Sequence, residues 1–514
     1  MKFKIFFYII IFNINTYLCI TENSDTIRFA FILSRTGSHS PSKLKKVNDE
    51  IYKDIFGYEW IGENELTNIG KRQQYYLGCL NNYKYKNLYS EIFHPKELLS
   101  FSSEANRTIQ SSYANLHGLY QNTNITLSDN QINNAVPPLD SNDRYIYAKN
   151  ELDKNKYVLP NNMQIVPVNT FYEKAHKYLL EKIENCPKME IFYEEGELLA
   201  MKKIEEILYY KSEKNVKRTY GEILVEILNE EKIFDEVYNI NILSKNITLF
   251  KIMAETFICD YFNTVNLDKF IEKGINIYKL LQMFEEFFGE ISIGGGIYNS
   301  QDERYNKTYE LSQKVNYDLF ISLLEWTKIR IDNDIIKNFN ILLYESPKIV
   351  LYISHHRSIE SLYFFLKETF NIKEAKTPLY VNFTSFIGIE LYRRNNDKNE
   401  YTKYDFYVRF IYDNKQIGDD VSYNEFSKKL NEKIILLEEL EDFCRLKEEN
   451  ANNGDINDDI LNSESNKKYK IFGTILICLF PIITSISIFL FFKTRIKEKD
   501  NVEFPGEIIN ENEN

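Results

Sequence analysis

The sequence lacks a surplus of positive charge, because 63 Lys and Arg stand against 75 Asp and Glu and the formal net charge is -12 at pH 7. Proteins that bind nucleic acid collect positive charge to neutralise phosphates, so we exclude nucleic acid as a partner. Cysteine and histidine are also scarce, with six of each, and no CxxC spacing of the kind found in zinc knuckles occurs. We therefore expect no metal and no cofactor. Apolar residues make up 44% of the chain, which is too many for a mainly disordered protein.

Both ends of the chain carry apolar runs of the kind that meet a membrane. Lys2 and Lys4 precede a short apolar run, which is typical of a signal peptide over residues 1–21 and too brief to span a bilayer. Residues 471–492 contain no charged side chain and have Lys and Arg on both sides, which predicts a transmembrane helix. The order of these two segments predicts a single-pass type I protein in the secretory pathway or at the cell surface.

This topology gives the chain a luminal or extracellular part and a cytosolic tail, residues 493–514. Residues 447–470 are rich in Glu, Asn and Asp, and we expect them to form a flexible stalk. The extracellular part has four cysteines, which allow three sets of pairings. Five Asn-x-Ser/Thr sequons make the chain a candidate glycoprotein. The sequons are at Asn106, Asn124, Asn246, Asn306 and Asn382.

Two strand patterns end abruptly in polar turns. Residues 27–33 form one apolar run and residues 348–353 form another, which leads directly into a helix pattern. Buried strands that end in this way mark the edge where open α/β sheets bind ligands. We predict an α/β fold with a mostly parallel open sheet flanked by helices, plus the C-terminal transmembrane helix. Residues 22–130 and 300–446 form this core, and residues 131–299, rich in Glu, Lys, Leu and Ile at helical spacing, form an inserted all-helical lobe.

Five segments, in the same order along the chain, resemble the histidine acid phosphatase family of the phosphoglycerate-mutase-like superfamily. The turn Arg35-Thr36-Gly37-Ser38-His39-Ser40-Pro41 resembles the family signature Arg-His-Gly-x-Arg-x-Pro. Residues 66–78 resemble Leu-Thr-x-x-Gly-x-x-Gln-x-x-x-Leu-Gly, and residues 101–108 resemble Arg-Ser-Thr-Asp-x-x-Arg-Thr. Residues 165–168 with 186–188 resemble two landmarks at the entry to the family's helical lobe, and residues 351–356 resemble Tyr-Ser-Ala-His-Asp.

The resemblance implies a phosphate site at the turn and at the second strand end. In the family a histidine attacks phosphorus, arginines and a second histidine hold the phosphate, and an aspartic acid protonates the leaving alcohol. Arg35 and His355 match phosphate-binding positions of the family. The other four positions carry different residues. Thr36 replaces the nucleophilic histidine, His39 the second arginine, Phe101 the third arginine, and His356 the aspartic acid.

These replacements decide the predicted function. Loss of a covalent nucleophile costs several powers of ten in rate, and each lost charge-stabilising donor costs on the order of 10² to 10³. We predict a membrane-anchored, phosphatase-like domain that is catalytically impaired or inactive and binds phosphate, phosphomonoesters or a protein partner. Two alternatives stay open. One is an active acid phosphatase with altered chemistry, and the other is an interaction module that does not use phosphate.

The resemblance also implies a disulfide between Cys186 and Cys444, which leaves Cys79 and Cys259 either free or joined. Arg107 lies within a matched segment, and we expect it to pair with a core carboxylate rather than with a ligand.

The three histidines of the matched turns have their own expected behaviour. Unperturbed imidazoles titrate near pH 6.5, so affinity for phosphate should rise as pH falls. If the rings of His39, His355 and His356 meet at one point they also offer a zinc or copper site, which the adjacent Arg35 disfavours.

Overall fold

The computed structural model describes the chain from Asp25 to Ile434 with several gaps. The chain divides into two units, residues 1–446 and 447–514, and the second lies wholly outside the described residues. The predicted signal peptide, stalk, transmembrane segment and tail also lie outside them, as do Cys186 and Cys444. Within the described part of the chain, no helix is both long enough and apolar enough to cross a membrane. The described residues are 25–48, 51–121, 125–135, 156–159, 163–170, 187–213, 217–233, 237–291, 303–335, 346–372, 380–394 and 401–434.

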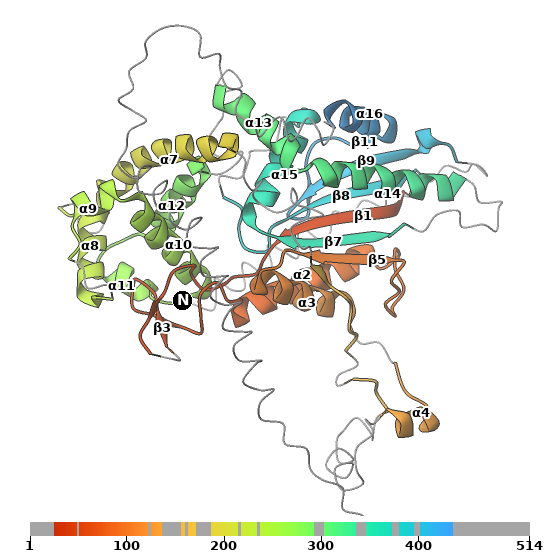
Figure 1. The fold of residues 1–514 in the computed structure, drawn as a ribbon, viewed down its shortest axis with the longest axis horizontal. Coiled ribbons are helices and arrows are strands. Elements are labelled where there is room, and N and C mark those ends of the chain that lie inside the picture. Colours follow the sequence, from red (N-terminus) through yellow and green to blue (C-terminus); the bar gives the residue numbers. More distant parts are fainter. Residues whose placement is uncertain are drawn as a thin grey trace, which may run out of the picture. The chain divides into compact units, whose positions relative to one another are not determined.

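An eight-stranded mixed sheet forms the centre of the fold (Figure 1), in the order β10-β9-β8-β1-β7-β5-β6 with β11 paired to β9. β1, β7, β5 and β6 are parallel neighbours, whereas β8 runs antiparallel to β1 and to β9. The predicted α/β class is thus confirmed, with a mostly parallel sheet that has an antiparallel part. The strands are β1 Thr26–Arg35, β5 Leu98–Ser102, β6 Asn169–Thr170, β7 Ile349–Ser354, β8 Phe386–Arg393, β9 Phe406–Tyr412, β10 Lys415–Gln416 and β11 Val421–Ser422.

Helices cover both faces of this sheet, which explains why β1 is almost continuously apolar. Alternate side chains of β1 point to opposite faces. Phe29, Phe31 and Leu33 join the core on one face, and Ala30 and Ile32 join the core on the other. The first core is closed by α14 (Tyr317–Ile335), α15 (His356–Thr369) and α16 (Tyr423–Lys433), with α13 (Glu303–Val315) beside α15. The second is closed by α2 (Asn68–Tyr85) and α3 (Asn106–Leu119).

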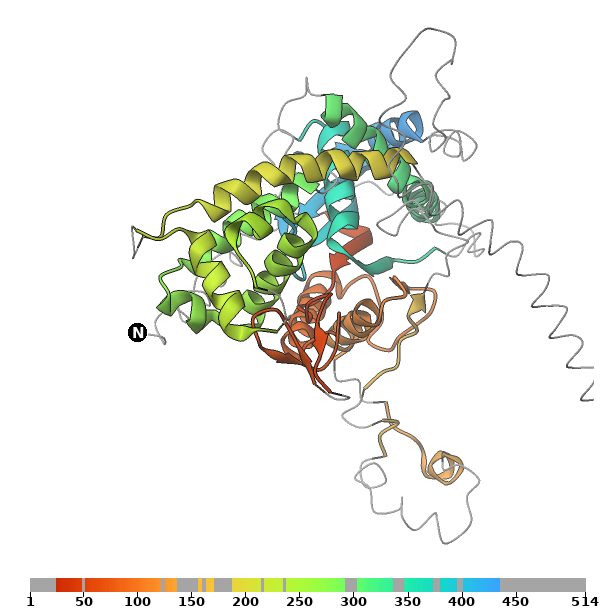
Figure 2. The same cartoon turned by 60° about the vertical axis from the view of Figure 1, so that its left-hand side comes forward.

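The helices from α7 to α12, which we call the lobe helices, lie together in space (Figure 2). They share one hydrophobic core, to which Ile55, Phe56 and Phe383 of other segments also belong. Capping side chains start two of them, because Thr219 forms a capping box at α8 and Asn246 accepts a hydrogen bond from the N–H of Leu249 at α10. The lobe helices are α7 Pro187–Leu208, α8 Tyr220–Glu231, α9 Ile240–Lys245, α10 Ile247–Asn263, α11 Leu267–Glu272 and α12 Ile277–Ile291. The remaining short elements are α4 Asp129–Asn134, η2 Lys403–Asp405, and a small sheet of β2 Lys45–Lys46, β3 Tyr52–Lys53 and β4 Glu59–Trp60.

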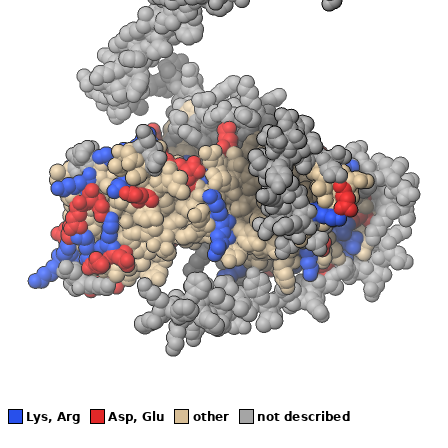
Figure 3. All heavy atoms as spheres, turned by 90° about the horizontal axis from the view of Figure 1, so that it is seen from below, with Lys and Arg blue, Asp and Glu red and all other residues tan. Residues whose placement is uncertain are grey.

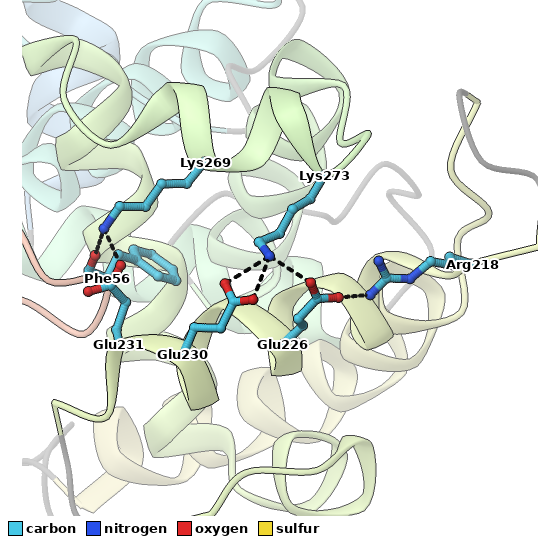
Figure 4. Close-up of polar contacts among 7 residues, drawn as sticks. All are labelled: Phe56, Arg218, Glu226, Glu230, Glu231, Lys269 and Lys273. Atoms are coloured by element: carbon cyan, nitrogen blue, oxygen red, sulfur yellow. Dashed lines mark hydrogen bonds and ion pairs between the residues drawn. The ribbon is translucent and has the colours of Figure 1, made fainter.

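Ion pairs connect α8 to α11 and its C-terminal end (Figure 4). The Lys273 ammonium lies 2.6 Å from Glu226 and 2.8 Å from Glu230. Lys269 forms an ion pair with Glu231 and donates a hydrogen bond of 2.6 Å to the carbonyl oxygen of Phe56. At this end of the molecule, acidic and basic side chains are interspersed on the surface (Figure 3). The lobe is thereby tied to the segment that carries the small sheet.

A buried carboxyl pair makes a second connection between that segment and the lobe. Asp54 is fully buried and accepts hydrogen bonds from the N–H of Phe56 at 2.8 Å and from the indole of Trp60 at 2.7 Å. Asp260 of α10 is equally buried, and its Oδ2 accepts a hydrogen bond of 2.8 Å from the Asn266 amide. Burial raises the pKa of Asp54, and burial together with the charge of Asp54 raises the pKa of Asp260 well above its ordinary value. The pair therefore retains a proton that free aspartates would release.

Candidate phosphate site

Parallel pairing brings the predicted site residues to one edge of the sheet. Arg35 at the end of β1 is level with Ser354 at the end of β7, and Ser102 of β5 is level with Ile353. The turn after β1 and the start of α15 consequently lie side by side, and the N–H of Thr36 donates to the carbonyl oxygen of Ser354 at 3.1 Å. Phe101 is different, because it lies inside β5 opposite Tyr352, with ring centroids 6.4 Å apart.

Side chains of α2 and α3 fix the backbone of the turn that follows β1. The N–H of Gly37 donates to the Ser111 hydroxyl at 3.2 Å, and the N–H of Ser38 donates to Gln73 at 2.9 Å. A Cβ on Gly37 would approach the backbone of Gly70 closer than 3.0 Å, so only glycine fits where the turn meets α2. The turn is therefore a rigid support for the side chains that it carries.

Arg35 is held by the segment that precedes β8. Only 4% of Arg35 is exposed. Its Nη1 donates to the carbonyl oxygen of Val381, and its Nη2 donates to the Tyr380 hydroxyl at 2.9 Å. The guanidinium also lies 4.0 Å from the ring centroid of Phe383 and 4.8 Å from that of Tyr380. We call residues 380–385 the strap, because this segment covers the cation that the resemblance assigns to phosphate.

Arg107 reaches the candidate site through His355. Its Nη2 lies 3.0 Å from Nδ1 of His355, and because arginine can only donate, Nδ1 must accept. The Nε2 of His355 lies 3.2 Å from the Ser103 hydroxyl, which in turn donates to Thr108 at 2.8 Å. Arg107 therefore fixes the tautomer and orientation of His355. The sequence signal was present, since Arg107 belongs to a matched segment, but residue type alone does not tell a ligand-site arginine from a structural one.

His39 and His356 do not titrate near pH 6.5, so that expectation was wrong for both. Burial lowers the pKa of His39 well below its ordinary value, and the charges of Arg107 and Arg35 add to the effect. Burial and then the charge of Arg35 lower the pKa of His356 in the same way. The Nδ1 of His39 lies 2.8 Å from the carbonyl oxygen of Ser40, so the neutral ring donates there. Both rings are neutral over the physiological pH range.

Two glutamates of the lobe helices interact electrostatically with the same cations, and no motif in the sequence marks either of them. Glu255 of α10 accepts hydrogen bonds from the N–H, at 3.2 Å, and the hydroxyl of Ser42. Burial raises the pKa of Glu255, although Ser42, Arg107 and Arg35 counteract it. Burial also raises the pKa of Glu285 of α12 to about 7, with Arg35 acting in the opposite direction. One turn further along α12, the ring of Phe288 lies 6.0 Å from Tyr380 of the strap.

The nucleophile position and the histidines complete the description of the site. Thr36 is 1% exposed, and its hydroxyl has no hydrogen-bond partner among the described residues. Across the same residues, no group of three or more His, Cys, Asp or Glu is arranged to hold a metal ion. The considered zinc or copper site is thus not formed by His39, His355 and His356. Cys79 and Cys259 are free thiols.

Comparison with known proteins identifies the family. The family model for the histidine phosphatase superfamily (branch 2) matches residues 24–413, and the chain belongs to this family. "Putative acid phosphatase 5" of Caenorhabditis elegans is 29% identical over 175 residues, which are 34% of this chain and 32% of that protein. Lysosomal acid phosphatase of Xenopus laevis is 30% identical over 97 residues, 19% of this chain and 22% of that protein. The chain thus spans about a third or less of these curated relatives.

Solved structures of phytases are similar to the chain over most of its length. The phytase of Klebsiella sp. ASR1 has 11% identity and a TM-score of 0.43, with 81% of this chain and 97% of that chain covered. The Citrobacter braakii phytase has 11% identity and a TM-score of 0.44, with 80% and 98% covered.

Proposed function

We propose that this chain is a membrane-anchored, secretory-pathway or cell-surface protein that binds phosphate or phosphomonoesters and has lost, or nearly lost, phosphohistidine catalysis. The observation that carries the proposal is Thr36 at the carboxyl end of β1, where the family has its nucleophilic histidine. A threonine hydroxyl attacks phosphorus only with the help of a base. The Thr36 hydroxyl has no partner among the described residues that would act as one.

Two other positions of the family pattern, those of His356 and Arg35, also support impaired catalysis. His356 stands where the family has its proton donor, and its lowered pKa leaves it without a proton to give at neutral pH. Arg35, the remaining family arginine, donates to the strap instead of an open site. Each defect by itself costs orders of magnitude in rate.

The remaining charges support binding. Arg35 and Arg107 are permanent cations whose charges both act on His39, and charge-assisted hydrogen bonds from arginine suit phosphate oxygens. The names of the two curated relatives, a putative acid phosphatase and a lysosomal acid phosphatase, support a phosphate ester as the ligand, and the second name supports the secretory pathway as the location.

One observation favours the alternative of an active phosphatase with altered chemistry. The pKa of Glu285 is about 7, so about half of its carboxyl groups are protonated at neutral pH. Glu285 would then act as the general acid in place of His356. This alternative still requires a base for Thr36.

A p-nitrophenyl phosphate assay from pH 4 to 8 tests the proposal. The native protein is compared with a variant that carries Thr36→His, His39→Arg, Phe101→Arg and His356→Asp, and equal thermal midpoints establish that both are folded. We expect negligible native turnover and a measurable gain in the variant. A native rate of the order of 10 per second, ordinary for an enzyme, would refute the loss of catalysis and favour the alternative.

A further inference from the structure

A second concave surface lies on the side of α2 that faces away from the phosphate site. It is a pocket of about 480 Å³ between α2 and α3, which we call the α2/α3 groove. Its volume lies within the range of small-molecule sites. Gly70 and Gln74 of α2 are buried toward the turn after β1, whereas Lys71, Arg72 and Tyr76 of the same helix are exposed on the groove side. The groove is lined by Asn68, Lys71, Arg72, Tyr75, Tyr76, Ala114 and His117.

The groove has a rigid floor. A Cβ on Gly78 would approach the backbone of Asn115, and a Cβ on Gly118 that of Tyr75, closer than 3.0 Å. These two glycines let α2 and α3 pack backbone to backbone beneath the groove. A site on two closely packed helices needs little ordering when a ligand binds, which favours affinity.

The charge of the groove is positive and uncompensated. Neither Lys71 nor Arg72 has an ion-pair partner among the described residues, although the whole chain carries a net charge of -12. In the described ranges of the chain, no acidic residue lines the groove and none occupies the first turn of α2, whose N-terminus adds a partial positive charge. Figure 3 looks onto the side of the molecule on which α2 and α3 lie, and shows Lys and Arg there among mostly uncharged residues. The groove therefore suits an anion.

Aromatic rings form the other part of the lining. The ring of Tyr75 lies 5.7 Å from that of His117 and 5.9 Å from that of Tyr76, and 60% of Tyr76 is exposed. Such a surface stacks a planar ring of a ligand beside the cations. We propose that the α2/α3 groove binds an aryl phosphate, with the phosphate on Lys71 and Arg72 and the ring against Tyr75, Tyr76 and His117. This groove is a different site from the phosphate site at the turn after β1, and the proposal for the groove does not depend on the proposed function of that turn.

Calorimetry with phenylphosphonate at pH 8 tests the proposal, because this probe cannot be hydrolysed at its P–C bond. We expect the Lys71→Gln/Arg72→Gln double variant to bind at least about tenfold more weakly, as charge-assisted hydrogen bonds to two cations are lost. Lys202→Gln, which removes an exposed charge from α7, is the matched control and should leave this affinity unchanged. Phenylphosphonate should also occupy the phosphate site, so we expect two binding events in the native protein. Arg35→Gln should weaken only the event at the phosphate site and leave the groove affinity unchanged, which separates the two sites.

A second arm tests the aromatic part with the same protein. Tyr76→Ser should weaken the binding of phenylphosphonate about threefold or more and leave the affinity for sulfate unchanged, because phenylphosphonate carries a ring and sulfate does not. Since Tyr76 is exposed, this variant should fold normally. The proposal is overturned if the double variant binds phenylphosphonate as tightly as the native protein, if binding disappears with Arg35→Gln alone, or if the native protein shows no binding at about 10 mM probe.

Discussion

The affinity of the phosphate site for an anion should fall as pH rises from 6 to 8, and Glu285 should cause the change. The sequence predicted this direction from histidine titration, but His39 and His356 are held neutral by burial and by Arg35. Glu285 titrates in the required range, with a pKa of about 7. Its ionised carboxylate would compete with a bound anion for the Arg35 guanidinium, so binding should favour the protonated form. Glu286, Tyr261 and Arg35 are the other titratable or charged groups that interact with it.

The magnitude follows from linkage. A carboxyl with this pKa is about 10% ionised at pH 6 and about 90% ionised at pH 8. If the anion binds only when Glu285 is protonated, the affinity falls about tenfold between these pH values. The substitution Glu285→Gln should remove this dependence and give the higher affinity at both values.

Calorimetry with sulfate is the suitable assay, because sulfate remains a dianion over the whole range and does not titrate itself. All proteins compared carry Lys71→Gln and Arg72→Gln, which remove the anion site of the α2/α3 groove. Glu272→Gln, which neutralises an exposed carboxylate of α11, is the matched control and should keep the native pH dependence. The reasoning fails if native affinity is the same at pH 6 and pH 8, or if Glu285→Gln retains the tenfold change. A rise in affinity that begins only well below pH 6 would assign the effect to the histidines instead.

Two further predictions concern the strap and the buried carboxyl pair. Tyr380→Phe removes the hydroxyl that accepts from Nη2 of Arg35, so sulfate affinity should rise about tenfold, the worth of one hydrogen bond from a charged donor. An unchanged or lower affinity by calorimetry would contradict the role of the strap. The raised pKa values of Asp54 and Asp260 mean that the folded state keeps a proton that the unfolded state releases. The stability that this pair contributes is therefore complete below the unfolded pKa near 3.8, and it is lost as pH rises through the pKa values of the folded state. Asp260→Asn needs no such proton, and its urea midpoint should therefore decrease less between pH 5 and pH 8 than the native midpoint. Equal decreases would show that the pair does not share a proton.

The sequence was sufficient to predict the sheet edge and its polar turns. An apolar run that stops abruptly at a polar turn identifies a buried strand by itself, and the two such runs are found paired as β1 and β7. The antiparallel direction of β8 could not be predicted in this way, because its side chains are buried on both faces of the sheet and such a pattern does not depend on strand direction. Strand direction is decided by the connections and by packing against distant helices.

The electrostatics of the site could not be predicted from the sequence. Glu285 and Glu255 are two glutamates in a helical region that is full of them, and only tertiary packing places these two near Arg35. The neutrality of His39 and His356 has the same origin, because burial and neighbouring cations lower a pKa that residue type alone leaves near 6.5. Motifs identify which residues meet, whereas the surroundings decide their protonation.

The support of the turn after β1 is complete although its reactive residues differ from the family pattern. Gln74 donates to the carbonyl oxygen of Arg35 at 2.6 Å, and Ser111 accepts from the N–H of Gly37. These contacts position the turn but take no part in attack on phosphorus. A site that keeps its backbone support and two cations while lacking a nucleophile and a proton donor is suited to holding an anion. Because the strap occupies Arg35, a ligand must displace Tyr380 or bind through Arg107 and His355, and the response of sulfate affinity to Tyr380→Phe distinguishes these two modes.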